Sequence, residues 1–215
     1  MIIDCISDLH GALPKLEGGD LLIIAGDLTA SDKLIQYEQF FAWLELQSYT
    51  KKVVIPGNHD KLIAKGKIPW STIPDGPTSL LLDSGTEFQG LKIWGNPWTR
   101  YFLGVNPHCD AFMWHHGVTE QEKLDLIPPE TDILITHSPP KGILDHSGNS
   151  ERYGSRQLAD WVMRFKPKLH IFGHIHEGYG RYQSENTKYE PTIFINAALM
   201  NIEYDPVNLP IRLVI

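Results

Sequence analysis

The stretch KKVVIPGNHD (residues 51–60) joins a short apolar run to three polar side chains in a row. The run has the length and composition of a buried strand. Gly57 alone can form the turn that ends such a strand, so the turn does not require Asn58, His59 or Asp60. An amide, an imidazole and a carboxylate placed together at the end of a buried strand therefore indicate a chemical role.

Similar apolar runs, rich in Ile, Leu and Val, recur along the chain. They cover Ile2–Ser7, Asp20–Gly26, Lys51–Pro56, Leu91–Asn96, Thr131–Thr136, Lys168–Gly173, Pro191–Ala197 and Ile211–Ile215. Runs of this kind are typical of strands that are covered on both faces. Residues 79–95 also predict a β-hairpin, with Gly85 in its turn region.

Two segments have the periodicity of amphipathic helices. In Ser31–Ser48 the predicted buried stripe is Leu34, Tyr37, Phe41 and Leu44, with Ser31 or Asp32 as the N-cap. In Ser155–Lys166 the predicted stripe is Leu158, Trp161, Val162 and Phe165, with Ser155 as the N-cap and Pro167 as the stop.

Strands interleaved with helices predict an α/β fold. Because the chain has many strand-like runs and few helical segments, the expected architecture is a β-sandwich of two packed mixed β-sheets with α-helices outside. The sequence has 215 residues, without an internal repeat or a linker that would divide it. One domain spanning residues 1–215 is expected.

Charge and cysteine content exclude some classes of protein. A net charge of −7, with no run of Lys and Arg, disfavours a broad nucleic-acid surface but leaves room for a small anionic substrate. Cys5 and Cys109 form no CxxC pair, which predicts a reducing compartment without disulfides. The sequence shows no basic leader region and no apolar run near the ~20 residues of a membrane helix. A cytoplasmic protein is expected, and the sequence predicts no oligomeric state.

Polar residues follow five of the apolar runs. They are Asp8 and His10 after the first, Asp27 after the second, Asn58 after the third, His137 after the fifth, and His174 and His176 after the sixth. Ligands of open α/β sheets bind outside the carboxyl ends of the strands, so these side chains are expected to converge on one point. Most of these pieces have a structural explanation when taken alone, since an Asp after a Gly is usually a turn residue, but the two histidines of GHIH have no obvious role in a turn. A purely structural explanation does not account for all five at once.

The residue types and spacing fit metal binding. Asp8 with His10, and His174 with His176, are i, i+2 pairs, which project to the same side in an extended chain. The candidate ligands are too many for one ion and suit two. Mixed imidazole and carboxylate ligation favours Mn, Fe, Zn or Co over Ca or Mg, which prefer oxygen throughout.

The ordered motifs resemble the signature of the calcineurin-like metallophosphoesterases. That signature is D-x-H, G-D, G-N-H-[DE], a later His and G-H-x-H, here between Asp8 and His176. LHIFGHIHEGYG (169–180), TIFINAA (192–198) and YDPVNLPI (204–211) further resemble the metallophosphoesterase-domain (MPPED) subfamily. The resemblance implies the calcineurin-like phosphoesterase fold, two metal ions at the strand ends, and hydrolysis of phosphoesters.

The resemblance also implies a role for each matched residue. One ion would be held by Asp8, His10 and His176, the other by Asn58, His137 and His174, and Asp27 would bridge both. His59 would not bind metal but would face the substrate phosphate, with Asp60 holding its ring by a hydrogen bond. The expected cofactors are two divalent transition-metal ions, with Mn²⁺ first and Fe, Zn, Co or Ni as alternatives.

Two cations ~3.5–4 Å apart can share one water or hydroxide as the nucleophile and neutralise charge on the phosphoryl oxygens. His59, if protonated, can stabilise the transition state or protonate the leaving oxygen. Asn58 and His59 are expected to contact the substrate. Trp98 and Arg100 are candidates for base stacking and phosphate pairing, although a core Trp and a surface Arg explain them equally well. Whether Asp145, His146 and Tyr179 line the pocket is open.

The leading function is therefore a phosphodiesterase for small phosphodiesters such as cyclic nucleotides, a substrate class that rests on the subfamily resemblance alone. The alternatives are a phosphomonoesterase for nucleotides or phosphoproteins, and a non-catalytic metal-binding scaffold. His59 and Asp60 beside a full ligand set favour catalysis, because a scaffold has no need of them.

Overall fold

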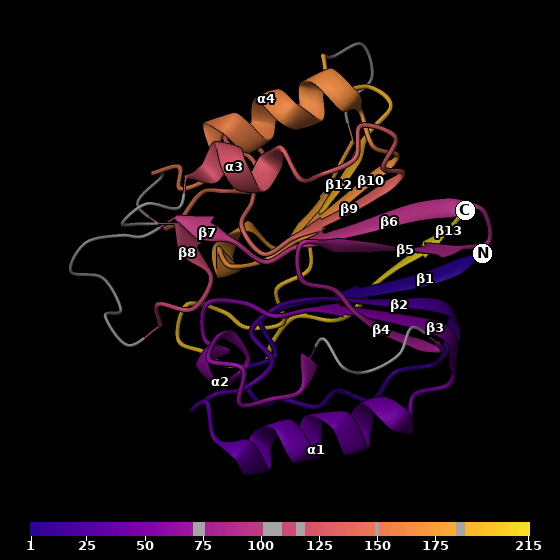
Figure 1. Ribbon diagram of the computed structural model, residues 1–215, viewed down its shortest axis with the longest axis vertical. Helices are drawn as coiled ribbons and strands as arrows, with labels where there is room; N and C mark the ends of the chain where they lie inside the picture. The colour runs from indigo at the N-terminus through magenta and orange to yellow at the C-terminus, as the bar shows by residue number, and fades with distance from the viewer. Residues whose placement is uncertain (71–75, 101–108, 115–118, 149–150, 184–187) are drawn as a thin grey trace.

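Two β-sheets packed face to face form the centre of the computed structural model (Figure 1). The structure describes all residues except 71–75, 101–108, 115–118, 149–150 and 184–187. The first sheet has the order β13 (Ile211–Val214), β1 (Ile2–Ile6), β2 (Gly19–Ala25), β3 (Tyr49–Ile55) and β4 (Thr78–Leu80). The second has the order β11 (Gly180–Tyr182), β12 (Ile193–Asn196), β10 (Leu169–Phe172), β9 (Ile133–Thr136), β6 (Leu91–Asn96) and β5 (Ser84–Phe88).

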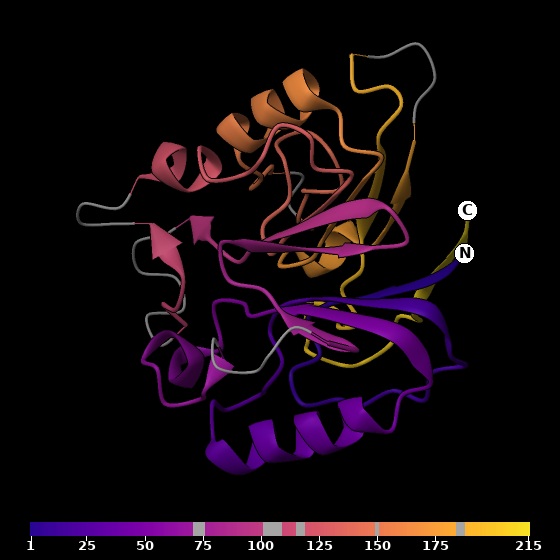
Figure 2. The same cartoon turned by 45° about the vertical axis from the view of Figure 1, so that its right-hand side comes forward.

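Helices cover the outer faces of both sheets, which confirms the predicted α/β fold with two mixed sheets (Figures 1 and 2). Helix α1 (Leu34–Glu45) lies along the first sheet, and α3 (Glu120–Leu124) and α4 (Arg156–Phe165) lie over the second. The remaining elements are the short helix α2 (Lys61–Ala64), a 3-10 helix at His176–Gly178, and a small pair of strands, β7 (Thr99–Arg100) and β8 (Met113–Trp114). In the part of the chain that the structure describes, no helix has both the length and the apolar character needed to cross a membrane.

Strand direction sets the position of the site. β1, β2, β3 and β4 are parallel, and so are β6, β9, β10 and β12, whereas β13, β5 and β11 pair antiparallel at the margins. The central strands therefore deliver their carboxyl ends to one end of the sandwich, away from the two chain termini (Figure 1).

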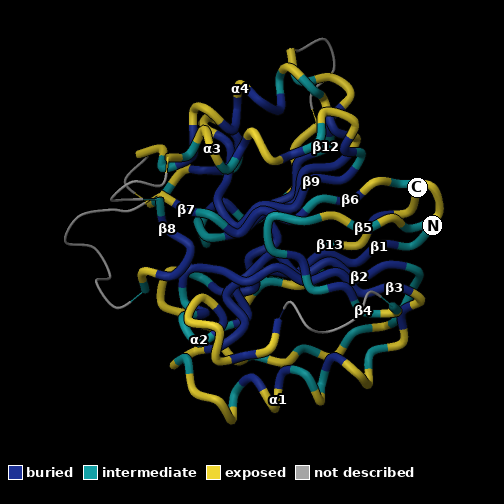
Figure 3. The backbone as a smooth tube through the Cα atoms, in the orientation of Figure 1, coloured by how far each residue is buried: buried dark blue, intermediate teal, exposed yellow. Residues whose placement is uncertain are grey.

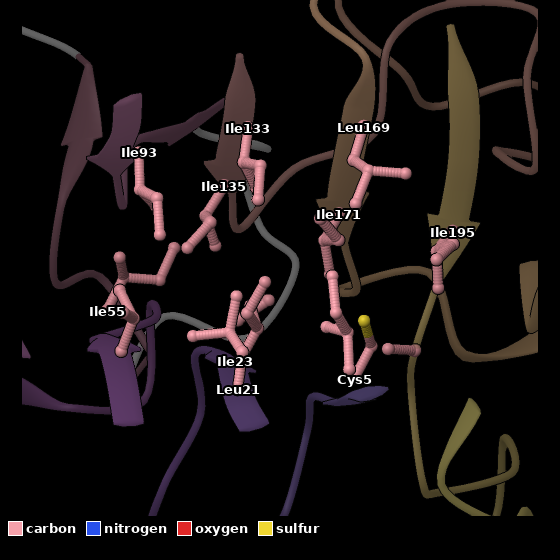
Figure 4. Packing of buried hydrophobic residues seen from close by; sticks show 14 of the residues in the cluster. Cys5, Leu21, Ile23, Ile55, Ile93, Ile133, Ile135, Leu169, Ile171 and Ile195 are labelled. Atoms are coloured by element: carbon pink, nitrogen blue, oxygen red, sulfur yellow. The ribbon is translucent and has the colours of Figure 1, made fainter. Parts of the chain in front are cut away.

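Alternate side chains of each strand enter different layers. On β2, Leu21 and Ile23 point between the sheets, where they meet Ile135 and Ile171 of the second sheet (Figure 4). The residue between them, Leu22, packs under α1 instead. Both faces of the strand are thus buried, which explains why the apolar runs are continuous rather than alternating (Figure 3).

Helix α4 follows its sequence pattern. Ser155 caps its N-terminus by accepting a hydrogen bond from the backbone N–H of Leu158, as predicted. The chain leaves the helix at Lys166, in the left-handed region and directly before Pro167. Leu158, Trp161 and Val162 are buried against the second sheet.

Helix α1 departs from the prediction at its start. Its N-cap is Lys33, not Ser31 or Asp32, because Asp32 turns into the left-handed region and its carboxylate accepts hydrogen bonds from Tyr37 Oη and Leu62 N. The buried stripe also differs: it is Tyr37, Phe40 and Leu44, while Leu34 is 55% exposed.

The predicted hairpin is present as β5 and β6, but the predicted position of its turn is wrong. Gly85 lies inside β5, opposite Trp94. The two-residue turn is Gln89–Gly90, both with positive φ (50° and 77°). This turn type matches the twist of the flanking strands, and Gly90 supplies the conformation at low cost.

His170 on β10 is fully buried on the outer face of the second sheet, against Phe172 and Phe194. The hydroxyl of Thr136 donates to Ser138 O, so Thr136 Oγ1 accepts from His170 Nε2 at 2.9 Å. Nδ1 then carries the lone pair, and it has no hydrogen-bond partner among the described residues. Because a proton on Nδ1 would be an unpaired buried charge, burial lowers the pKa of His170 to about 3.

This lowered pKa predicts acid sensitivity. The unfolded chain takes up the proton below an ordinary histidine pKa of ~6.5, and the folded chain does not, so this contribution to stability is present above pH ~6.5 and is lost as the pH falls. When the pH is lowered from 7 to 5, the free energy of unfolding should fall by about 2 kcal/mol less in His170→Gln than in the wild type. Urea unfolding at both pH values measures this difference, and an identical pH dependence of the two proteins would contradict it.

Candidate metal centre

The loops after β1, β2, β3, β9 and β10 bring their polar side chains together at one end of the sandwich. Among the described residues, three groups of side chains have ligand atoms within 4.8 Å of one another: Asp8, His10 and His176; His10, Asp27 and His59; and Asp8, Asp27 and His137. The residues involved lie far apart in sequence but at neighbouring strand ends. Asn58 Oδ1 lies 2.9 Å from His137 Nε2, and the ring centroid of His174 lies 5.1 Å from that of His137, so the seven candidate ligands lie together.

Asp27 occupies the middle of the cluster. Its Oδ2 lies 3.3 Å from His137 Nε2, 3.7 Å from His10 Nε2 and 3.9 Å from His59 Nε2. Its Oδ1 accepts a hydrogen bond from the backbone N–H of His59 at 2.9 Å. One buried carboxylate thus faces both halves of the ligand set, which is the position that a bridging ligand needs.

Two histidines are oriented by backbone carbonyls. Nδ1 of His137 lies 2.8 Å from Ala25 O, and Nδ1 of His176 lies 2.8 Å from Asn201 O. A carbonyl can only accept, so each Nδ1 carries the proton and each Nε2 is left as a potential ligand. The two Nε2 atoms lie 3.3 Å from Asp27 and 3.4 Å from Asp8. This pattern of a metal-facing nitrogen and a hydrogen-bonded outer nitrogen is the usual arrangement of metal-binding histidines.

Buried acceptor atoms surround Nε2 of His137. This nitrogen faces both Asn58 Oδ1, at 2.9 Å, and the carboxylate of Asp27, so two acceptors converge on one buried point. Burial alone would lower the pKa of His137, but the charge and hydrogen bond of Asp27 raise it to about 9. The extra proton fills the need for a cation that a metal ion would otherwise satisfy. The donor set therefore fits divalent metal ions.

The other charges fit the same explanation. Burial would raise the pKa of Asp8 and Asp27, but neighbouring histidines lower both, His176 acting on Asp8 and His137 on Asp27. Burial lowers the pKa of His10 to about 4. Both carboxylates are then ionised and His10 is neutral near pH 7, which are the forms that bind metal.

Four candidate ligands have backbone conformations that are rare for residues with side chains. Asp8, His10, Asp27 and His174 have φ values of 51°, 41°, 55° and 69°. Such conformations cost energy and are concentrated at functional sites. The expectation that the i, i+2 pairs lie in extended chain is therefore wrong, because the chain turns as soon as each strand ends.

A cavity of about 410 Å³ opens over these ligands. It is lined by Asp27, Asn58, His59, Met113, Ser147, Tyr153, His174, Ile175, His176, Glu177, Ile202 and Tyr204. The ring of Tyr204 stands edge-on to His10 and His176, with ring centroids 4.8 and 5.1 Å apart. Tyr204 also has a positive φ of 65° and is 46% exposed, so it forms an aromatic wall above the ligands.

Comparison with known proteins agrees with this geometry. The family model of the calcineurin-like phosphoesterases matches residues 1–178. The chain belongs to the calcineurin-like phosphoesterase family. Human metallophosphoesterase domain-containing protein 1 is 35% identical over 233 residues, covering 96% of this chain and 68% of the human protein. This relative confirms the resemblance to the metallophosphoesterase-domain subfamily.

Solved structures confirm the fold. The protein TT1561 of Thermus thermophilus aligns with a TM-score of 0.64 and 16% identity, over 91% of this chain and 88% of that one. Phosphopantetheinyl hydrolase from Mycobacterium tuberculosis aligns with a TM-score of 0.51 and 17% identity, again over 91% and 88%. Metallophosphoesterases bind divalent metal ions, and the donor set described above meets that requirement.

The prediction that Asp60 holds the ring of His59 is wrong. The Asp60 carboxylate is fully buried and accepts hydrogen bonds from Gly57 N, Leu28 N and Tyr37 Oη, at 2.8, 3.2 and 3.2 Å. The tight turn from Gly57 to Asp60 directs the carboxylate back under the loop, away from the imidazole. Burial, and then the charge of Asp27, raises the pKa of Asp60 to about 7. Asp60 joins the loops after β2 and β3 to α1.

Trp98 and Arg100 are not among the described residues that line the cavity. The indole N–H of Trp98 donates to Asp83, and the ammonium of Lys123 stands 4.0 Å from the centroid of its ring. This arrangement gives no support to substrate binding by Trp98. Arg100 is exposed, next to residues outside the described part of the chain.

Asp145, His146 and Tyr179 are also absent from that lining. Asp145 is fully buried and accepts from Gly142 N, Gly154 N and Arg152 Nη1, so it holds the loop that carries Ser147 and Tyr153 to the cavity. The backbones of His146 and Arg152 pair as an isolated antiparallel β-bridge in the same loop. The hydroxyl of Tyr179 donates to Leu209 O.

Three glycines allow the ligand loops to approach one another. A Cβ on Gly26 would collide with the ring of His137, one on Gly57 with the carboxylate of Asp27, and one on Gly173 with that of Asp8. The ligands pack directly on bare backbone, so no side chain can be added at these positions without moving a ligand.

Gly173→Ala should therefore weaken metal binding at least about tenfold, because its methyl group would displace Asp8. Gly148→Ala is the matched control, since a Cβ there meets nothing within 4 Å. Titration of each purified protein with Mn²⁺, with circular dichroism to verify folding, makes the comparison. Wild-type affinity in a folded Gly173→Ala protein would contradict the packing argument.

Proposed function

We propose that this metallophosphoesterase is a dinuclear metal-dependent phosphodiesterase that hydrolyses small phosphodiesters. The observation that carries the proposal is the lining of the cavity above the ligands. Its described residues include carboxylates, histidines and apolar groups but no Lys or Arg. The positive charge available to a substrate is therefore limited to the metal ions and any protonated histidine.

This limit favours a diester over a monoester. A phosphomonoester carries a charge of about −1.5 to −2 at pH 7, whereas a diester has a single ionisable oxygen and a charge of −1. Glu177 adds a further carboxylate to the cavity wall and disfavours a second negative charge on the substrate. The apolar wall of Met113, Ile202 and Tyr204 suits an uncharged ester group. A diester has such a group on both sides of phosphorus, whereas a monoester has only one.

The proposed ligands divide into two groups. Asp8, His10 and His176 would hold one ion, Asn58, His137 and His174 the other, and Asp27 would bridge them. Bound divalent ions lower the pKa of water for attack on phosphorus and neutralise charge on the phosphoryl oxygens. Mn²⁺ is the proposed metal, with Fe, Zn, Co and Ni as alternatives that the same N and O donors accept.

His59 is the proposed contact with the reacting phosphoester. Its side chain is 15% exposed, and its Nε2 lies on the cavity side, near Asp27. This reach also places it in one of the three candidate ligand groups, so metal analysis of a His59 variant must separate the two roles. As a residue beside the ions, His59 would donate a hydrogen bond to the substrate.

Cyclic nucleotides are the proposed substrates among small diesters. The support is the relationship to the metallophosphoesterase-domain subfamily and a cavity of about 410 Å³, which is of the size that small ligands occupy. The rings of Tyr153 and Tyr204 offer flat apolar surfaces for a base.

The charge argument predicts a preference that can be measured. With Mn²⁺, kcat/KM for bis-p-nitrophenyl phosphate should exceed that for p-nitrophenyl phosphate by about tenfold or more, equivalent to ~1.4 kcal/mol of uncompensated charge. A chelator should abolish both activities. A preference for the monoester would favour a phosphomonoesterase instead, and no activity on any ester with metal bound would favour a scaffold.

Bridging by Asp27 predicts a second result. Asp27→Asn should remove activity and reduce bound metal well below the wild-type content, because both groups of ligands lose the shared carboxylate. Asp160→Asn, on the exposed side of α4, is the matched control and should retain both. Elemental analysis after gel filtration measures the metal, and two ions at full occupancy in Asp27→Asn would refute the bridging role.

A further inference from the structure

We infer that Cys109 is the residue that orients His59, and that it selects the tautomer in which Nε2 donates to the substrate. The catalytic role of His59 in this inference rests on the proposed function, whereas the orientation of its ring does not. It assigns to a thiol the positioning role that the sequence pattern predicted for Asp60.

The segment Cys109–Ala111 is fastened along the loop that follows β3. The backbone N–H of Ala111 donates to Asn58 O at 3.2 Å. On the other side of His59, Lys61 Nζ lies 2.9 Å from Asp110 Oδ1. The segment therefore has a fixed position beside His59, although it is distant in sequence.

The backbone carbonyl of Cys109 fixes the amide of Asn58. Asn58 Nδ2 donates to Cys109 O at 3.2 Å, and a carbonyl can only accept. The amide oxygen must then point the other way, where it lies 2.9 Å from His137 Nε2. Cys109 thus directs the cation-binding atom of Asn58 into the metal centre.

The side chain of Cys109 meets the ring of His59 on its outer side. The distance from Sγ to Nδ1 is 3.4 Å, and Cys109 is a free cysteine. The thiol of Cys109 can donate its proton to Nδ1, and in that arrangement the ring proton of His59 is on Nε2. In the opposite tautomer, a lone pair on Nε2 would face the negatively charged substrate.

Among the described residues, Cys109 is the hydrogen-bond partner of Nδ1 of His59, while Asp27 Oδ2 lies 3.9 Å from Nε2. The carboxylate of Asp60 is occupied by Gly57 N, Leu28 N and Tyr37 Oη. The ring of His10 meets His59 edge-on, at 4.6 Å between centroids, and restrains its plane but not its tautomer. A neutral thiol orients the imidazole without adding a charge, so His59 acts as a hydrogen-bond donor to the leaving oxygen.

The test compares Cys109→Ala with Cys109→Ser, which retains a donor. Histidine-selective ¹⁵N NMR on the zinc-loaded proteins should show the Nε2–H tautomer of His59 in the wild type and in Cys109→Ala a mixture. On a ribose ester such as a 2′,3′-cyclic nucleotide, Cys109→Ala should lower kcat about tenfold, the size typical of lost orienting partners. KM and metal content should not change, p-nitrophenyl esters should be affected less, and Cys109→Ser should retain most of the activity.

Two controls make the result specific. Cys5→Ala removes the only other thiol, in the core between the sheets, and should change neither the tautomer nor kcat. In a His59→Asn background, Cys109→Ala should cause no further loss, because its effect is exerted through His59.

Three outcomes would overturn the inference: an unchanged His59 tautomer in Cys109→Ala, an equal loss of kcat in the His59→Asn background, or a loss of bound metal. If the wild type hydrolyses no phosphodiester, the proposed function fails while the NMR result still decides whether Cys109 orients the ring.

Discussion

Two carboxylates and an amide oxygen, buried around one point beside the ring of His137, impose the constraint on which this structure depends. The carboxylates of Asp8 and Asp27, the amide oxygen of Asn58 and Nε2 of His137 are all nearly excluded from water. Such a group is stable only around positive charge. The fold has to hold these atoms close together in spite of their repulsion, and most features near the site serve that purpose.

Rigid strands and small backbone volume meet the constraint together. Parallel strands of both sheets end at the same place, and their packed isoleucine faces prevent the ends from separating. The chain then turns at once, through left-handed residues and glycines that no larger residue could replace. Carbonyls of Ala25 and Asn201 complete the arrangement by fixing which nitrogen of each histidine faces inward.

Features that follow from the order of residues along the chain could be predicted from the sequence. The directions in which some of the side chains point could not. Strands, sheets and the set of strand-end residues follow from apolar runs and the polar residues after them. The hydrogen-bond partners of Asp60 could not be predicted, because a turn within three residues directs its carboxylate away from His59. The N-cap of α1 was missed because the Asp32 carboxylate accepts a hydrogen bond from Leu62 N, in α2. Tyr204 and Met113 reach the cavity from segments with no strand-end pattern, so only the fold reveals them.

The site has two parts that differ in how well they tolerate substitution. Gly26, Gly57 and Gly173 belong to the inner part, where an added methyl group would displace a ligand. The walls are formed by side chains such as Tyr204, Tyr153 and Met113, on segments that contribute none of the candidate ligands. Substitution of the wall residues can therefore change the shape of the cavity while the candidate ligands keep their positions.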